Sequence, residues 1–316
     1  MEICFVSNDG TSDSEKSGID PVAKGIEKKV FTVEPSKAYY EYYIVTVDTL
    51  GNKSPEIPIK VYVATVSKIP EGFVEIPAAS ISGNETWTPA SDVFVSGRNL
   101  EIASLYMSDH VVTRGEYKAV MGRDPSTAAY NNPVNYISWY DALVYCNTLS
   151  IKEKLTPCYA IGGKTNPSEW GAVPTENDST WDAATCDSKA NGFRLPTEVE
   201  WEWAARGGEK YTYAGSDTIG DVAWYGTNGT RDVKTKKANT YGLYDMSGNV
   251  WEWCWDWKGS ISSDTPDSGP ASGSYRCQRG GSWCDSANYT QVDSRYGYDP
   301  SFRYYSYGFR VVCNAR

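Results

Sequence analysis

One stretch of the sequence is most informative about the fold, Gly192-Phe193-Arg194-Leu195-Pro196-Thr197-Glu198-Val199-Glu200-Trp201-Glu202-Trp203-Ala204-Ala205-Arg206-Gly207-Gly208. Within it, Thr197 and Glu200 have the spacing of a capping box, in which each side chain satisfies the other residue's free backbone N–H at a helix start. The two glycines after Arg206 are typical of a helix end. The stretch therefore predicts a short helix from Thr197 to Arg206.

The same start and stop signals predict two more helices nearer the N-terminus. One begins at the capping box of Thr113 and Glu116 and runs to Met121, with Gly122 as its stop. The other begins at the capping box of Ser138 and Asp141 and runs to about Leu149.

A strand is predicted over Trp251–Trp257, because the residue type alternates strictly along this segment. Four tryptophans fall on one face, and Glu252, Cys254 and Asp256 fall on the other. A face with four large aromatic side chains favours burial against the rest of the domain.

Composition limits the classes of function. The 316 residues are 40% hydrophobic, which suits a packed core, and the formal net charge of -10 leaves no basic excess for binding nucleic acid. No apolar run is long enough to cross a membrane, so membrane attachment would need a lipid anchor. The single histidine, His110, excludes a metal site with two histidine ligands from one chain.

The first 68 residues differ in pattern from the rest. Residues 40–48 are rich in β-formers, 49–54 read as a turn, and 57–63 alternate again, which together predict a hairpin. The hairpin resembles the last strands of an immunoglobulin-like or fibronectin-type-III module, but it is too short for a complete sandwich. We expect an N-terminal segment with a small β-module in 1–68 and a main domain in 69–316. The first residues do not read as a signal peptide, so the chain is either cytosolic or lacks its leader.

Two further blocks join the first stretch. They are Tyr241-Gly242-Leu243-Tyr244-Asp245-Met246-Ser247-Gly248-Asn249-Val250-Trp251-Glu252-Trp253, and Arg279-Gly280-Gly281-Ser282-Trp283 with Gly308-Phe309-Arg310. In this order and spacing the three blocks resemble the formylglycine-generating-enzyme (sulfatase-modifying-factor) family. The resemblance covers roughly residues 70–316. It implies an α+β, loop-rich, C-type lectin-like fold of the formylglycine-generating-enzyme variety.

That resemblance also raises an enzymatic alternative, an oxidase acting on a protein cysteine by copper-assisted thiol chemistry. The family's two reactive cysteines lie shortly after the Gly-Gly-Ser-aromatic motif, and those places hold Asp285 and Thr290 here. Cys284 is one residue off and has no cysteine partner five residues further on. Because a soft metal needs both thiolates, the sequence disfavours the oxidase.

The last 37 residues more closely resemble a subset of this fold, the variable proteins of diversity-generating retroelements, of the treponemal type. The shared pattern is Gly-Gly-Ser-Trp, a spaced Ala, Val-x-x-Arg, Pro, Arg and Gly-Phe-Arg. The resemblance implies a non-catalytic, ligand-binding lipoprotein displayed at the cell surface, outer-membrane-anchored, with a leader that this chain lacks. It also implies a variable region over about 280–316, changed by mutagenesis directed at adenines.

Adenine-directed changes of AAY codons cannot produce Lys, Glu, Gln, Trp or Met, and none of these occupies the sixteen positions predicted to vary and to bind ligand. These are Cys284, Asp285, Ser286, Asn288, Tyr289, Ser294, Tyr296, Gly297, Tyr298, Asp299, Ser301, Phe302, Tyr304, Tyr305, Ser306 and Tyr307, with Thr290 and Asp293 ambiguous. Tyrosine gives large, rigid contact area at low entropy cost. We therefore expect the six tyrosines and Phe302 to form one exposed patch, although a role in the lectin-fold core stays the alternative.

A fixed scaffold is expected to hold this region whatever fills the variable positions. Its residues are Arg279, Gly280, Gly281, Ser282, Trp283, Arg295, Arg303 and Arg310. Arginine suits such a role because its five donors can tie several carbonyls or carboxylates at once.

Two minor features stay open at this level. Asp245, Glu252 and the Gly248 and Val250 carbonyls match a calcium loop in the family; alternatively Glu252 pairs with an arginine and Asp245 caps a turn. Cys158 and Cys186 flank a polar insert and are either free or bridged. No cofactor is required, and the partner is expected to be a macromolecule, a protein or a cell surface, bound by a monomer.

Overall fold

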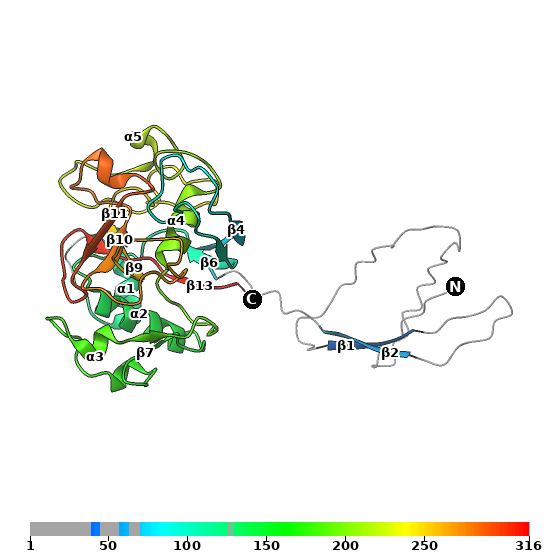
Figure 1. Ribbon diagram of the computed structural model, residues 1–316. Helices are drawn as coiled ribbons and strands as arrows, with labels where there is room; N and C mark the ends of the chain where they lie inside the picture. The colour runs from blue at the N-terminus through cyan, green and yellow to red at the C-terminus, as the bar shows by residue number, and fades with distance from the viewer. Residues whose placement is uncertain (1–38, 45–56, 63–69, 126, 128, 316) are drawn as a thin grey trace. The chain divides into compact units, whose positions relative to one another are not determined.

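The computed structural model describes residues 39–44, 57–62, 70–125, 127 and 129–315. The chain divides into two compact units, Met1–Lys68 and Ile69–Ala315 (Figure 1). In the first unit, β1 (Tyr39–Ile44) pairs antiparallel with β2 (Ile57–Tyr62), with Tyr39 opposite Tyr62. This confirms the predicted strand pair, while the predicted turn over 49–54 lies outside the described residues.

The larger unit has the predicted α+β architecture, and its central sheet has the strand order β11-β10-β9-β12. The strands are β9 (Trp251–Trp257), β10 (Arg276–Arg279), β11 (Arg295–Tyr298) and β12 (Tyr307–Gly308). β10 runs antiparallel to β9 and β11, whereas the short β12 runs parallel to β9. Three of the four strands thus come from the last 41 residues of the sequence, and the predicted variable region supplies both edge strands of the sheet, β11 and β12.

A second sheet of three strands, β13-β6-β3, joins the end of the unit to its beginning. Its strands are β3 (Phe73–Ile76), β6 (Leu105–Ser108) and β13 (Val312–Asn314), all antiparallel. Two pairs complete the strands: β4 (Ala79–Ile81) with β5 (Leu100–Ile102), and β7 (Tyr159–Ala160) with β8 (Thr185–Cys186).

The three predicted helices form with the predicted caps. α1 (Arg114–Met121), α2 (Trp139–Lys152) and α4 (Glu198–Arg206) each begin at a complete capping box. Gly122 and Gly207 end α1 and α4 in the left-handed conformation that glycine adopts without strain, and α2 continues three residues beyond the expected end. These termini are local in sequence, which is why sequence patterns could specify them.

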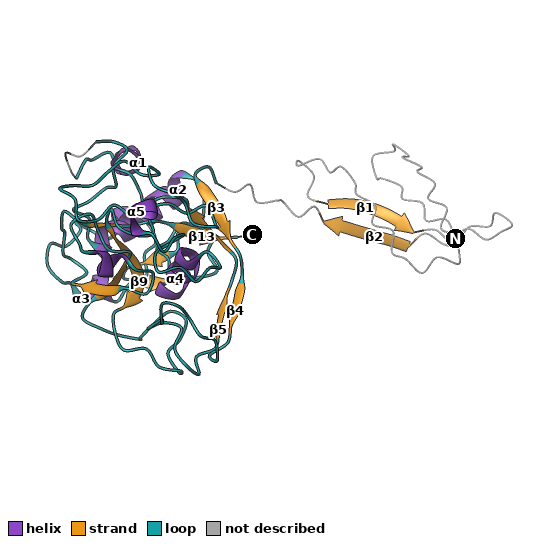
Figure 2. Ribbon diagram, turned by 90° about the horizontal axis from the view of Figure 1, so that it is seen from above, coloured by secondary structure: helices purple, strands orange, loops and turns teal. Residues whose placement is uncertain are grey.

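The remaining helical segments are single turns within long loops. They are α3 (Ser179–Asp182), α5 (Ile219–Val222), η1 (Pro167–Glu169) and η2 (Ala287–Thr290). In Figure 1, α5 lies at one end of this unit and α3 with β7 at the other, with β9 to β11 between them. Loops make up much of its outer surface in Figure 2, as expected for a loop-rich fold. Among the described helices, none is both long and apolar enough to span a bilayer.

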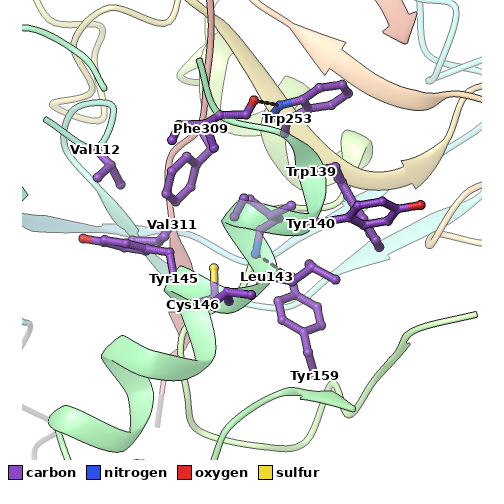
Figure 3. Close-up of a cluster of buried hydrophobic side chains, with 14 of the residues drawn as sticks. Val112, Trp139, Tyr140, Leu143, Tyr145, Cys146, Tyr159, Trp253, Phe309 and Val311 are labelled. Atoms are coloured by element: carbon purple, nitrogen blue, oxygen red, sulfur yellow. Dashed lines mark hydrogen bonds between the residues drawn. The ribbon is translucent and has the colours of Figure 1, made fainter. Parts of the chain in front are cut away.

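The main hydrophobic core lies between α2 and the chain after β12. Trp139, Leu143 and Cys146 of α2 are fully buried beside Phe309 and Val311 (Figure 3). The indole N–H of Trp253 donates to the Ile137 carbonyl at 2.8 Å, so this aromatic side chain is buried without an unpaired donor.

The burial of β9 differs from the expected pattern, because Trp255 and Trp257 on the tryptophan face are only partly buried while the opposite face is buried. Trp251 and Trp253 are buried as predicted, and so are Glu252, Cys254 and Asp256 on the opposite face. The polar face is tolerated because its carboxylates have partners; for example, the Glu198 amide donates to Asp256 at 2.8 Å.

Cys158 and Cys186 are free thiols. Cys186 of β8 lies opposite Tyr159, not Cys158. The Cys158 thiol instead donates to the Gly192 carbonyl at 3.3 Å.

Candidate ligand-binding site

Two of the predicted scaffold arginines, Arg279 and Arg295, make buried ion pairs with helix α4. Arg279 of β10 binds Glu198 at 3.2 Å and Glu202 at 2.5 Å, and it also donates to the Val292 carbonyl at 2.8 Å. Arg295 of β11 binds both oxygens of Glu198, at 2.6 and 2.7 Å. Two strands that carry or flank the variable region are therefore tied to one face of one helix.

Arg310 and Arg303 anchor the end of the region elsewhere. Arg310 binds both oxygens of Glu252 of β9, at 2.6 and 2.7 Å, and donates to the carbonyls of Ser108 and Tyr244. Arg303 binds Asp141, the capping-box residue of α2, at 2.6 Å. Each arginine thus links the C-terminal region to an element far away in the sequence.

The buried charges perturb one another. Burial alone would raise the pKa of Glu198, but the hydrogen bond from Arg295 and the charges of Arg279 and Arg295 hold it at about 2. Asp256 of β9 has no arginine partner among the residues that the structure describes. Burial together with the charge of Glu198 raises the pKa of Asp256 to about 8. Glu198 is therefore ionised at neutral pH and Asp256 is largely protonated.

Glycine is required at the turn after β10. Gly280 and Gly281 have φ values of +89° and +73°, and a Cβ on Gly281 would lie 2.5 Å from the Tyr289 carbonyl oxygen. Ser282 follows, fully buried, and its hydroxyl donates to Asp285 at 2.5 Å. Trp283 is half-buried and lies beside Tyr305, with ring centroids 5.3 Å apart.

Most of the predicted variable positions lie on the surface. Thirteen of the sixteen are exposed or partly exposed; the exceptions are Ser301, Ser306 and Tyr307. The exposed fractions of Tyr289, Tyr296 and Tyr304 are 50%, 41% and 38%. The ambiguous Thr290 is buried, and its hydroxyl donates to the Ala287 carbonyl, whereas Asp293 is half-buried.

Three separate segments of the variable region meet around one hollow of about 290 Å³. It is lined by Trp251 and by eight of the predicted variable residues, Cys284, Asp285, Tyr289, Tyr296, Tyr304, Tyr305, Ser306 and Tyr307. The other eight predicted positions, Ser286, Asn288, Ser294, Gly297, Tyr298, Asp299, Ser301 and Phe302, do not line it.

The expectation of a single exposed aromatic patch is wrong for Tyr307. Its side chain is 5% exposed and packs edge-on against Trp253, with ring centroids 5.5 Å apart. Tyr298 and Phe302, 4.4 Å apart, are partly buried against the same core. The alternative of core packing therefore holds for these three rings, because β11 and β12 turn one side of the region inward.

Two fixed residues at the site were not predicted. Trp251 lines the hollow, with its ring centroid 5.4 Å from that of Tyr296. Tyr136 is exposed, adopts a positive φ of 57°, and donates its amide to the Tyr304 carbonyl at 2.9 Å. The alternation of β9 signalled a tryptophan face, but nothing in the sequence distinguished Trp251 from the other three tryptophans.

The residues matched to a calcium loop do not fit a calcium ion as they stand. Both oxygens of Glu252 accept hydrogen bonds from Arg310, and one also accepts from the Trp201 indole at 2.6 Å. Asp245 accepts from the Lys234 amide at 2.9 Å and from the Asn249 side chain at 3.3 Å. Residues 70–315, apart from 126 and 128, hold no cluster of three or more His, Cys, Asp or Glu suited to a metal. The arrangement is that of the alternative, an arginine pair and a capped turn.

The fold and these blocks define the class of protein: the chain belongs to the sulfatase-modifying factor enzyme 1-like domain family, whose model matches residues 59–315. Among solved structures it is similar to Treponema denticola variable protein 1, with 37% identity and a TM-score of 0.66 over 77% of this chain and 94% of that one. The predicted C-type lectin-like fold and the resemblance to retroelement variable proteins of the treponemal type are thus confirmed.

Curated relatives carry different names. The chain is 35% identical to the chaperone protein LppX of Paenibacillus barcinonensis, over 75% of this chain and 94% of that protein. It is also 35% identical to the formylglycine-generating enzyme of Streptomyces coelicolor, over 43% of this chain, and it spans only about half (51%) of that enzyme. The comparisons support a ligand-binding variable protein, and the family also contains enzymes.

Proposed function

We propose that this chain is a non-catalytic protein displayed at the cell surface, which binds a macromolecular ligand through a region that a retroelement diversifies. The observation that carries the proposal is the composition of the hollow. Eight of its nine lining residues belong to the predicted variable set, whereas the side chains of Arg279, Arg295 and Arg310 are 0–5% exposed in ion pairs. Such a separation lets side chains at the hollow change without altering what holds the backbone.

The energetics support the same division. Substitution of an exposed side chain that makes no special contact changes the free energy of unfolding by less than about 0.5 kcal/mol. Loss of one partner from a buried ion pair costs about 3–5 kcal/mol. The exposed positions around the hollow can therefore vary at low cost, whereas Arg279, Arg295 and Arg310 cannot.

The residues at the two positions where the family's oxidase has its reactive cysteines support a binding role for this chain. Asp285 and Thr290 occupy the places of the two cysteines, and the Thr290 hydroxyl is engaged with the Ala287 carbonyl at 2.9 Å. Cys284 is exposed, and its thiol lies 3.3 Å from the Ser282 hydroxyl. Neither oxygen-bearing side chain can replace a thiolate as a ligand for a soft metal.

Sequencing of the gene's neighbourhood tests the proposal. We expect a near-copy of the codons for residues 280–316, differing only where that copy carries adenine, beside a gene for a reverse transcriptase. Absence of such a copy would argue against diversification. Copper-dependent consumption of a substrate thiol by the purified chain would instead favour the oxidase.

A further inference from the structure

We propose that the hollow binds a cationic group, the ammonium of a lysine or the guanidinium of an arginine on a protein ligand. The inference rests on the proposed function, because it names the chemistry that the present residues of the variable site select. It follows from the rings around the hollow, the carboxylate at its edge, and its size.

Aromatic rings line the hollow from several directions. Trp251 and Tyr296 have ring centroids 5.4 Å apart with their planes tilted by 33°, and Tyr304 and Tyr305 are 4.0 Å apart and tilted by 36°. The planes of Tyr304 and Tyr307 differ by 56°. Rings at such mutual angles form walls rather than one flat stack, and the negative faces of aromatic rings attract a cation placed among them.

Two phenols at the hollow, those of Tyr305 and Tyr307, are held in the neutral form. Burial and the neighbouring tyrosines and Asp285 raise the pKa of Tyr307, and the hydrogen bond with Tyr304 raises that of Tyr305. The walls therefore attract a cation through their rings, and the single formal charge at the hollow is that of a carboxylate.

Asp285 supplies that carboxylate and is held in place from two sides. Its side chain accepts from Ser282 at 2.5 Å, and its backbone carbonyl accepts from the Gly226 amide at 3.0 Å. No lysine, arginine or histidine lines the hollow. Asp285 therefore lacks a basic partner among these lining residues, and a ligand cation would supply one.

Size and overall charge agree with a single basic side chain. The hollow of about 290 Å³ lies at the lower end of the range for ligand pockets, roughly 300–1,000 Å³, so it suits one side chain rather than a large molecule. The chain's net charge of -10 attracts basic partners over a longer range.

The same chemistry already occurs inside the domain. The Arg276 guanidinium is buried, 3.5 Å from the ring centroid of Trp257 and 3.8 Å from that of Trp139. The chain's own arginine fills that aromatic site. The hollow is also lined by aromatic rings, and it is open to a cation from a ligand.

Titration with choline and with its neutral isostere 3,3-dimethyl-1-butanol, followed by saturation-transfer NMR, tests the inference. We expect choline to bind about tenfold more tightly, since the two differ only in charge. Asp285→Asn and Tyr296→Leu should each weaken choline binding about fivefold. Asp299→Asn is the matched control, because Asp299 is also acidic and predicted to vary but does not line the hollow.

Equal affinity for the two compounds, or choline binding that neither variant weakens, would overturn the inference. A selection of peptides from a random library on the intact chain separates this failure from that of the proposed function. Peptides that bind through Tyr304 and Tyr305 but lack basic residues would leave the binding function standing with a different ligand chemistry. If no selected peptide depends on these tyrosines for binding, the result would count against both the inference and the proposed function.

Discussion

Arg279 of β10 and Glu202 of α4 form an ion pair of 2.5 Å in which both side chains are completely buried. Glu202 also binds Arg206 at 2.8 Å, and Arg279 also binds Glu198, so the pair belongs to a buried network between the helix and the central sheet. The strand that precedes the variable region is thereby joined to a helix whose ends the sequence specifies.

Replacement of Arg279 should destabilise the protein strongly. In Arg279→Met, Glu202 keeps Arg206 and Glu198 keeps Arg295, but both lose part of their compensation, so we expect a loss of about 3–5 kcal/mol in the free energy of unfolding. Urea denaturation measures it, with Asn288→Ala as the exposed control that should change stability by less than about 0.5 kcal/mol. A loss under about 1 kcal/mol in Arg279→Met would contradict the scaffold role.

Tyr304 and Tyr307 should respond differently to truncation although they lie three residues apart. Tyr307→Ala removes a ring packed on Trp253 and should cost about 3 kcal/mol, whereas Tyr304→Ala removes a ring that is 38% exposed and should cost under about 1 kcal/mol. Thermal unfolding of the two variants compares them, and melting temperatures lowered by the same amount would show that this division is wrong.

His110 should make stability fall as the pH rises above neutrality. Burial lowers the pKa of His110, but its contacts with Asp109 and Glu116 prevail and raise it to about 9, against about 6.5 in an unfolded chain. Because the folded state binds the proton more tightly, this contribution is complete below pH 6.5 and is lost as the pH rises through 9, by roughly 3 kcal/mol. Denaturation at pH 6, 7.5 and 9 measures the loss, and His110→Gln should remove this part of the slope. An identical slope in that variant would refute the assignment.

Chelation should leave the melting temperature unchanged. Since Glu252 is fully engaged by Arg310 and Trp201, a calcium ion at this loop would have to break a buried ion pair. Thermal unfolding with EDTA and with added calcium gives the answer. A melting temperature that falls with EDTA and recovers with calcium would establish the calcium loop that the sequence suggests.

The sequence by itself determined the local features of this protein. The capping boxes at Thr113, Ser138 and Thr197 and the glycine stops were predictable because each depends on residues within one or two helical turns. The strand Trp251–Trp257 was predictable from its alternation, and the family blocks indicated the fold.

Only the tertiary structure decided how the C-terminal region divides between core and surface. Tyr304 and Tyr307 are the same residue type in the same polar context, yet one is exposed and the other packs on a strand more than 50 residues away. Likewise, Glu252 could have served a metal or an arginine, and the choice depends on Arg310, 58 positions further along the chain. Sequence patterns report periodicity over a few residues, whereas burial and ion pairing depend on which distant segments the fold brings together.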